Sequence, residues 1–149
     1  WLLHCDEPAK QGGENTFLDH EIAYILFNQQ NKNISSLMNN ITYTIPENKK
    51  TGRKSVDGYV FSFENKYKKL HMRFTMRENN IHWNENAVNE VNMLKEIIKK
   101  SERYHVKYKL DYRQGVITNN ILHKRSSFTN LDNQTRLIYR IRSKKRVVF

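Results

Sequence analysis

The sequence predicts a mixed fold of mostly β-strands with a few helices (α+β), and three observations carry this prediction. Short runs in which apolar and polar residues alternate recur along the chain and crowd its C-terminal third, as half-buried strands do. One segment, residues 85–101, repeats its apolar residues at helical spacing. No internal repeat or heptad run is present. Many short strands with few helices suit a β-sandwich or jelly roll with helical insertions.

Turn and breaker residues divide the first part of the chain. A short strand ends at Leu2 and Leu3, before turns at Pro8 and at the pair Gly12–Gly13. Asp19 is a suitable N-cap for a helix that runs to about residue 28. Three further elements follow: a short helix at 33–41, a strand at 41–46 and a polar loop at 47–57.

The second part alternates strands with one clear helix. The runs at 58–65 and 69–77 predict a hairpin with a longer loop. The helix at 85–101 places a set of apolar residues on one face, namely Ala87, Val88, Val91, Leu94, Ile97 and Ile98. Three more strands are expected, at 104–110, 115–122 and 135–142.

The composition points to an anionic partner inside a cell. The net charge of +11 favours nucleic acid, an anionic membrane or an anionic small molecule, although Asn- and Lys-rich codon usage explains the charge equally well. Cys5 is the only cysteine, which excludes an internal disulfide and favours the cytoplasm. No apolar stretch approaches the ~18–20 residues of a membrane span. The chain opens at Trp1 as if already inside a strand, so we expect its N-terminal part to be missing.

His4 and Asp6 form the pattern H-x-D. On a strand, residues two apart share a face, so both side chains could reach one metal ion. This pattern is the first part of the two-His-one-carboxylate set that holds Fe(II) and leaves open positions. The alternative is a surface histidine beside an acidic turn.

His123 follows an apolar run and precedes a strand in which arginines alternate with apolar residues. Arg136, Arg140 and Arg142 fall at even spacing, so their guanidinium groups share one face. On an outer face they are solvated; on an inner face they would need an anion, and a carboxylate pairs well with arginine. No phosphate-binding loop, zinc-ligand spacing or nucleophile elbow is present.

Four segments together resemble the taurine dioxygenase-like family of Fe(II)- and 2-oxoglutarate-dependent oxygenases. They are "LHCDEPAKQGGENTFLDHEIAYIL", "LHMRFTMR", "QGVITNNILHKRSSF" and "RLIYRIR", and the resemblance runs from about residue 2 to 146. It implies a double-stranded β-helix, which is a distorted jelly roll. Residues 1–149 would form one oxygenase domain that is incomplete at its N-terminus.

The resemblance also implies roles for single residues. His123 matches the distal iron ligand, and Arg136 matches the arginine that grips the far carboxylate of 2-oxoglutarate. Asn15 occupies a position where many members have a threonine that touches the same carboxylate. Arg140 matches a position that contacts an acidic substrate in some members.

The family places its H-x-D on a strand that precedes the Gly-Gly turn by roughly twenty or more residues. His4 and Asp6 lie too close to Gly12–Gly13 for that register, so the true pair would lie upstream of Trp1. The alternative, that His4 and Asp6 are themselves the ligands, stays open.

The implied function is oxidation, most simply hydroxylation, of an unactivated C–H bond in a small, amino acid-like or anionic substrate. Fe(II), 2-oxoglutarate and O2 would take part, and neither nucleic acid nor membrane is an expected partner. With two of three iron ligands upstream, this chain alone would be weakly active. The alternative from a different class is a non-catalytic, basic nucleic-acid-binding module.

Overall fold

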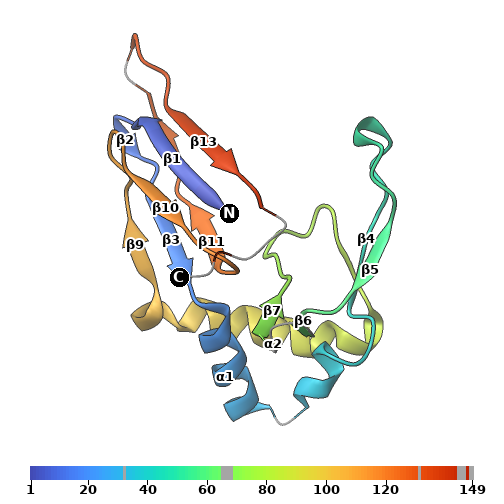
Figure 1. The fold of residues 1–149 in the computed structure, drawn as a ribbon. Coiled ribbons are helices and arrows are strands. Elements are labelled where there is room, and N and C mark those ends of the chain that lie inside the picture. Colours follow the sequence, from blue (N-terminus) through green and yellow to red (C-terminus); the bar gives the residue numbers. More distant parts are fainter. Residues whose placement is uncertain (32, 65–68, 131, 144–146, 148–149) are drawn as a thin grey trace. The chain divides into compact units, whose positions relative to one another are not determined.

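The computed structural model describes residues 1–149 except 32, 65–68, 131, 144–146 and 148–149. It confirms a mixed α+β fold of small antiparallel sheets with two α-helices in the described ranges (Figure 1). The chain forms two compact units. Unit 1 combines Trp1–Asp19 with Tyr104–Phe149, and unit 2 is His20–Arg103.

Unit 1 consists of short strands from both ends of the chain. They are β1 (Leu2–Glu7), β2 (Gln11–Gly12), β3 (Asn15–Leu18), β9 (Val106–Tyr108), β10 (Gly115–Ile117), β11 (Leu122–Arg125), β12 (Phe128–Thr129) and β13 (Leu137–Ile141). Their antiparallel pairing gives three small sheets, in the orders β10-β1-β13, β11-β3-β9 and β12-β2 (Figure 1). Both ends of the sequence therefore contribute to the same sheets.

Cys5 is the one buried residue of β1, and the other residues of this strand are partly exposed. Cys5 is fully buried and lies opposite Ile138 of β13. Trp1, just before β1, contacts Phe17 of β3 with ring centroids 6.5 Å apart, so this contact joins the sheet of β1 to the sheet of β3. The opposite face of the β1 sheet carries exposed apolar side chains, among them Ile117, Tyr139 and Ile141. We call the face of β1 that carries Cys5 the inner face.

Two predicted strands of unit 1 differ from the structure. The strand expected to end at Leu3 continues to Glu7, because β1 is paired on both sides. The strand expected at 115–122 is two strands in different sheets, since β10 pairs with β1 and β11 pairs with β3. Between them, the Asn119 side chain forms two hydrogen bonds with the backbone of Val147, which fixes the chain where it changes sheets.

Unit 2 contains the helices and two further sheets. Its elements are α1 (His20–Gln30), η1 (Ile34–Leu37), β4 (Tyr43–Ile45), η2 (Lys49–Thr51), β5 (Val56–Gly58), β6 (Phe61–Glu64), β7 (Lys69–Met72), β8 (His82–Trp83), η3 (Glu85–Ala87) and α2 (Val88–Lys100), where η marks a 3-10 helix; η4 (Glu102–Tyr104) follows at the boundary. The sheets have the orders β5-β4-β8 and β6-β7. With eleven and thirteen residues, the two α-helices of the described chain are too short to cross a membrane.

The core of unit 2 follows the predicted helical pattern. Val91, Leu94 and Ile97 are buried on α2, and α1 packs against α2 with Phe27 fully buried. The first turn expected of the helix at 85–101 is instead η3, capped by the Asn84 side chain, which accepts a hydrogen bond from the Asn86 N–H.

The other predictions for unit 2 hold in part. The helix α1 begins directly after Asp19, as expected, and ends two residues later than predicted. The hairpin is confirmed as β6 and β7, while its connecting residues 65–68 lie outside the described part. The short helix expected at 33–41 is the single 3-10 turn η1. The polar loop ends two residues earlier than predicted, since Val56 pairs with Ile45 in β5.

Candidate anion-binding site

Strands β3 and β11 bring two predicted site residues onto one face. His123 lies opposite Phe17, and Arg125 lies opposite Asn15. Opposite residues in an antiparallel pair share a face, and so do residues two apart on one strand. The side chains of Asn15, Phe17, His123 and Arg125 therefore project to the same side of this sheet. Asn15 and Phe17 are buried there.

The His123 imidazole is exposed and lies beside an indole ring. Its centroid is 4.7 Å from that of Trp1, with an angle of 51° between the rings. Nδ1 lies 3.5 Å from the Ile121 carbonyl oxygen, which is long for a hydrogen bond. Nε2 has no hydrogen-bond partner in the described part of the chain, so it is available to a ligand.

Arg136 lies just before β13, with its side chain beside Gly13. Its guanidinium carbon is 5.0 Å from the centroid of the Phe128 ring. Burial lowers the pKa of Arg136, the positive charge of Arg125 lowers it further, and Cys5 opposes the shift. The backbone N–H of Arg136 donates a hydrogen bond to the Asn130 Oδ1, 3.1 Å away. The charged group is thus half-buried and close to a second cation.

Arg125 is that second cation, and no sequence motif singled it out. Its guanidinium carbon is 4.4 Å from the centroid of the same Phe128 ring. Within the described residues, neither Arg125 nor Arg136 forms an ion pair. The signal in the sequence was its position two residues after His123 on a strand, which puts both side chains on one face.

Asn15 adds an unsatisfied donor to this group. Its Nδ2 is buried and has no hydrogen-bond partner among the described residues. An unpaired buried amide costs about 1–3 kcal/mol, and two unpaired guanidinium groups around one ring repel each other. A carboxylate could pair with the two guanidinium groups, and the Asn15 amide projects to the same side of the sheet as Arg125. The arrangement is therefore a candidate anion-binding site.

His4 and Asp6 are not brought to His123. His4 is the neighbour of Cys5 on β1 and so lies on the opposite face of the strand, facing away from the inner side. Asp6 lies at a bulge between Cys5 and Glu7, which interrupts the alternation on which the shared face of His4 and Asp6 depends.

Iron fits the described residues only in part. They contain no group of three His, Cys, Asp or Glu side chains that could hold a metal ion. His123 is the one predicted ligand on the inner side of unit 1. The described residues thus lack a complete set of iron ligands.

Arg140, the predicted substrate contact, lies opposite Leu3 in the pairing of β13 with β1. It shares a face with Ile138, which is opposite Cys5, so its side chain starts from the inner face. The guanidinium itself is exposed. Arg140 thus starts from the same face as Ile138, whereas Arg136 lies before the first residue of β13.

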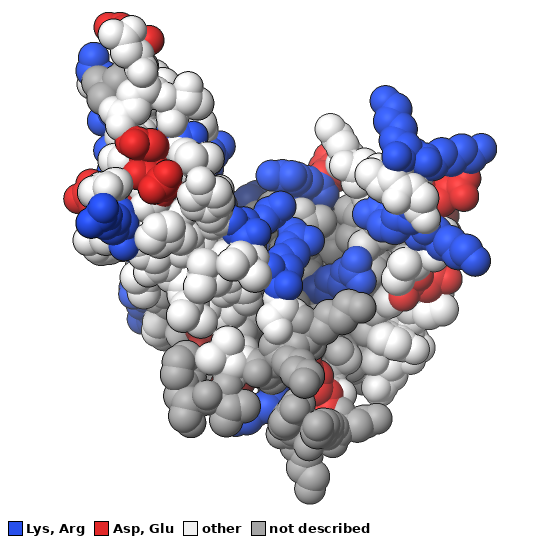
Figure 2. All heavy atoms as spheres, turned by 45° about the horizontal axis from the view of Figure 1, so that its top comes forward, with Lys and Arg blue, Asp and Glu red and all other residues white. Residues whose placement is uncertain are grey.

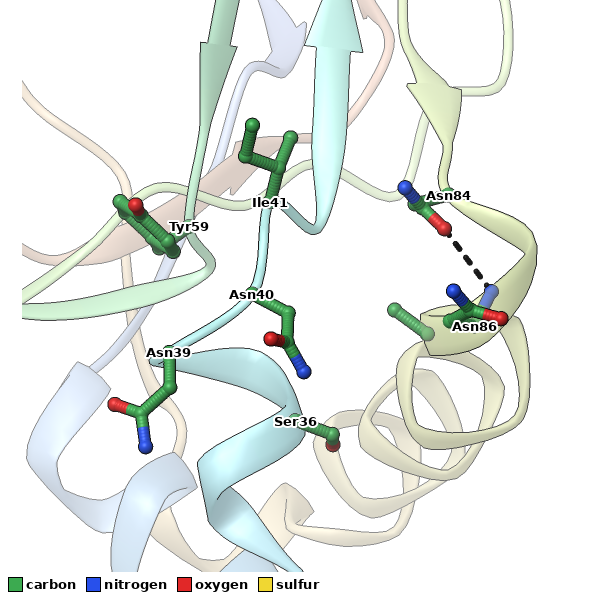
Figure 3. Close-up of a pocket in the computed structure, with 8 residues that line it drawn as sticks. Ser36, Asn39, Asn40, Ile41, Tyr59, Asn84 and Asn86 are labelled. Carbon is green, nitrogen blue, oxygen red and sulfur yellow. Dashed lines mark hydrogen bonds between the residues drawn. The ribbon is translucent and has the colours of Figure 1, made fainter.

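A separate cavity of about 280 Å³ lies in unit 2. Figure 3 shows Asn40, from the segment after η1, and Asn84 and Asn86, before and within η3, around this cavity. Its lining is Ser36, Asn39, Asn40, Ile41, Tyr59, Asn84, Asn86 and Ala87. None of the predicted site residues is among them. The lining carries neither a carboxylate nor a cation, so it does not match the predicted diacid site.

Replacing Asn15 with leucine is expected to weaken ligand binding without lowering the free energy of unfolding. The change removes the buried, unpaired amide, so the free energy of unfolding should stay equal or rise by up to about 2 kcal/mol. Binding of 2-oxoglutarate should weaken by about tenfold, because one donor to the carboxylate is lost. Urea unfolding and calorimetric titration measure the two effects. A leucine variant that is less stable and binds normally would show that Asn15 is structural.

No protein-family model matches this chain, and a search of curated proteins finds no significant match either, so the functional argument stands on the geometry of unit 1 and on the motif resemblance.

Proposed function

We propose that the chain supplies the 2-oxoglutarate-holding part of an Fe(II)- and 2-oxoglutarate-dependent oxygenase domain of the taurine dioxygenase-like kind. One observation carries the proposal: Arg136 lies half-buried without an acidic partner in the described chain, next to a second guanidinium. A carboxylate of a dicarboxylic acid is one ligand that suits such a group, and Arg136 is the residue to which the motif resemblance gives this role.

The proposed fold is a double-stranded β-helix, or distorted jelly roll, with unit 2 as an insertion. The contact between Trp1 and Phe17 supports it, because it joins two antiparallel sheets built from both ends of the chain. The chain order supports it as well, since unit 2 lies between β3 and β9 in the sequence.

The chain's own residues would bind and orient the diacid. Arg136 and the Asn15 amide would hold the far carboxylate, and His123 would leave Nε2 free toward the metal. Bound together, Fe(II) and 2-oxoglutarate would supply the oxidising chemistry with O2 in the cytoplasm. Arg140, on the same inner face, would meet the negative charge of a small, amino acid-like substrate. The proposal requires two further iron ligands that the described residues do not provide.

The proposal is tested by titrating the chain with 2-oxoglutarate in a calorimeter, without oxygen and with or without Fe(II). We expect saturable binding that depends on Arg136 and gains little from Fe(II), because one imidazole holds the ion weakly. Lack of saturable binding at millimolar 2-oxoglutarate would overturn the proposal.

The same titration, followed in the visible spectrum, decides the role of His4. If Fe(II) binds near stoichiometrically, the weak absorption band of an Fe(II)–2-oxoglutarate chelate should appear. Loss of that band in His4→Ala would identify His4 as a ligand after all. A reading frame that continues upstream and contains an H-x-D roughly twenty or more residues before Gly12 would instead support the family register.

A second candidate function, a basic nucleic-acid-binding module, is favoured by the hairpin of β4 and β5. Figure 2 shows Lys and Arg side chains gathered at the tip of this hairpin, which holds Lys49, Lys50, Arg53 and Lys54. All four are exposed, and Glu47 is the one acid that pairs with this group in the described chain, at 3.8 Å from Lys49. Arg53 is fixed to the Pro46 carbonyl at 2.9 Å.

Replacing Lys49, Lys50 and Lys54 with glutamine tests this candidate. If the hairpin contacts phosphates, the slope of log K against log salt for nonspecific DNA should become shallower by roughly 2 to 3 units. The matched control replaces three exposed lysines elsewhere, Lys100, Lys107 and Lys124, and has the same net charge. Fluorescence anisotropy measures both. Equal slopes in the two variants would reject the hairpin as a binding surface.

A further inference from the structure

We infer that Arg125 is a second guanidinium of the anion site and grips the same carboxylate as Arg136. The inference rests on the proposed function and goes beyond it, because neither the sequence motifs nor the resemblance assigned Arg125 a role. It makes the site a two-arginine clamp around Phe128, with Asn15 as the third donor.

The position of Arg125 on β11 determines the side of the sheet to which it projects. It is opposite the buried Asn15 and two residues from His123, so it projects to the same side as both. Lys124, its neighbour in the chain, is opposite Thr16 and projects to the other side. Two adjacent cations on one strand therefore differ in the direction they face.

The environment of the two charges also supports the clamp. Both guanidinium carbons lie within 5.0 Å of the Phe128 centroid. Each gains a cation–π contact, yet neither has an acidic partner in the described chain, and their charges repel. An anion between them would relieve that repulsion, so ligand binding and the approach of the two arginines favour each other.

The double-glycine turn lies beside the two-arginine clamp. Phe128 is opposite Gly12 in the pairing of β12 with β2, which sets the ring beside the double-glycine turn. Gly13 has φ +74°, a backbone conformation that favours glycine, and a Cβ atom there would be in ordinary contact with the Arg136 Nε at 3.4 Å and the Phe128 Cβ at 3.6 Å. The double-glycine turn, Arg136 and Phe128 therefore lie together.

The ligand class follows from the donors. Two planar guanidinium groups and one amide N–H suit a carboxylate, which has two oxygens and about four lone-pair positions. An inorganic phosphate offers similar acceptors, so the test includes both anions. A neutral ligand would leave the two positive charges unpaired.

The test is a double-mutant cycle on 2-oxoglutarate binding with Arg125→Gln, Arg136→Gln and the double variant, and with Lys124→Gln as the matched control. Arg125→Gln should weaken binding by about 10- to 100-fold, as expected for a lost hydrogen bond to a charged group, and Arg125→Lys should restore part of it. Lys124→Gln should change the affinity less than about twofold, because Lys124, exposed like Arg125, projects to the other side of β11. The double variant should lose far less than the product of the single losses, because both arginines act on one carboxylate.

Distinct outcomes separate this inference from the proposed function. If 2-oxoglutarate binds and depends on Arg136, but Arg125→Gln behaves like Lys124→Gln, the clamp is wrong and the proposed function stands. Losses that multiply in the double variant also reject the clamp. If the chain binds phosphate through both arginines but not 2-oxoglutarate, the clamp stands and the proposed function fails. Circular dichroism and thermal unfolding establish that each variant is folded.

Discussion

Replacing Arg136 with glutamine is expected to weaken 2-oxoglutarate binding by about 100-fold or more. The guanidinium is half-buried and has no acidic partner in the described chain, so the ligand carboxylate would be its main counter-charge. A bidentate, charge-assisted pair of this kind is among the strongest polar contacts, with each bond contributing roughly 1.5–3 kcal/mol. Lysine at this position should recover only part of the affinity, because an ammonium cannot form the same fork.

The stability of the Arg136→Gln variant gives an independent readout. A structural arginine would destabilise the fold on removal, whereas an unpaired one that repels Arg125 should leave the unfolding midpoint equal or higher. Arg142→Gln is the control, since it removes an exposed arginine just beyond the end of β13. Calorimetric titration and urea unfolding measure the two quantities. Normal binding in Arg136→Gln, or an equal loss in Arg142→Gln, would contradict the proposed site.

Periodicity predicted the elements whose packing is local. The buried residues of α2 are the ones at helical spacing, because a helix that packs on one side must repeat its apolar residues every three or four positions. The hairpin of β6 and β7 was predictable for the same reason, with a period of two. Such patterns are set by neighbours in the chain and need no knowledge of the partner element.

Features that depend on distant pairing were not predictable. The break between β10 and β11 falls in a run whose residues 115–122 continue to favour a strand, and only the separate partners β1 and β3 reveal it. The bulge after Cys5 likewise has no local signal, yet it decides where Asp6 lies. Arg125 was overlooked since it stands in a charged stretch beside Lys124, and its role depends on Phe128 and Asn15 across the sheet. Strand pairing carries this information, and single-strand patterns do not.

The division into two units also has no marker in the composition. Asp19 follows β3 and His20 begins α1, with no Gly- or Pro-rich linker between them. The boundary between the units therefore resembles an ordinary strand-to-helix connection. The return at residue 104 is equally abrupt. An insertion between two strands of a sheet is visible only when β3 and β9 are seen to pair.

Replacing Phe27 with alanine is expected to lower the free energy of unfolding of unit 2 by about 3–5 kcal/mol. Phe27 is fully buried on α1, which packs against α2, and the truncation would leave a cavity as well as remove apolar contacts. Ile25→Ala is the matched control on the same helix, because Ile25 is 52% exposed and should cost less than about 1 kcal/mol.

The two tryptophans allow each unit to be followed by itself. Trp1 belongs to unit 1 and Trp83 to unit 2, so a Trp1→Phe background makes urea unfolding by fluorescence specific for unit 2. Burial raises the pKa of the Cys5 thiol above its ordinary value, and the same burial shields it from thiol reagents until unit 1 opens. We expect Phe27→Ala to shift the Trp83 transition strongly. A shift no larger than that of Ile25→Ala would contradict the placement of Phe27 in the core. If Cys5 labelling moves to lower urea concentration by the same amount as the Trp83 transition, the two units unfold together.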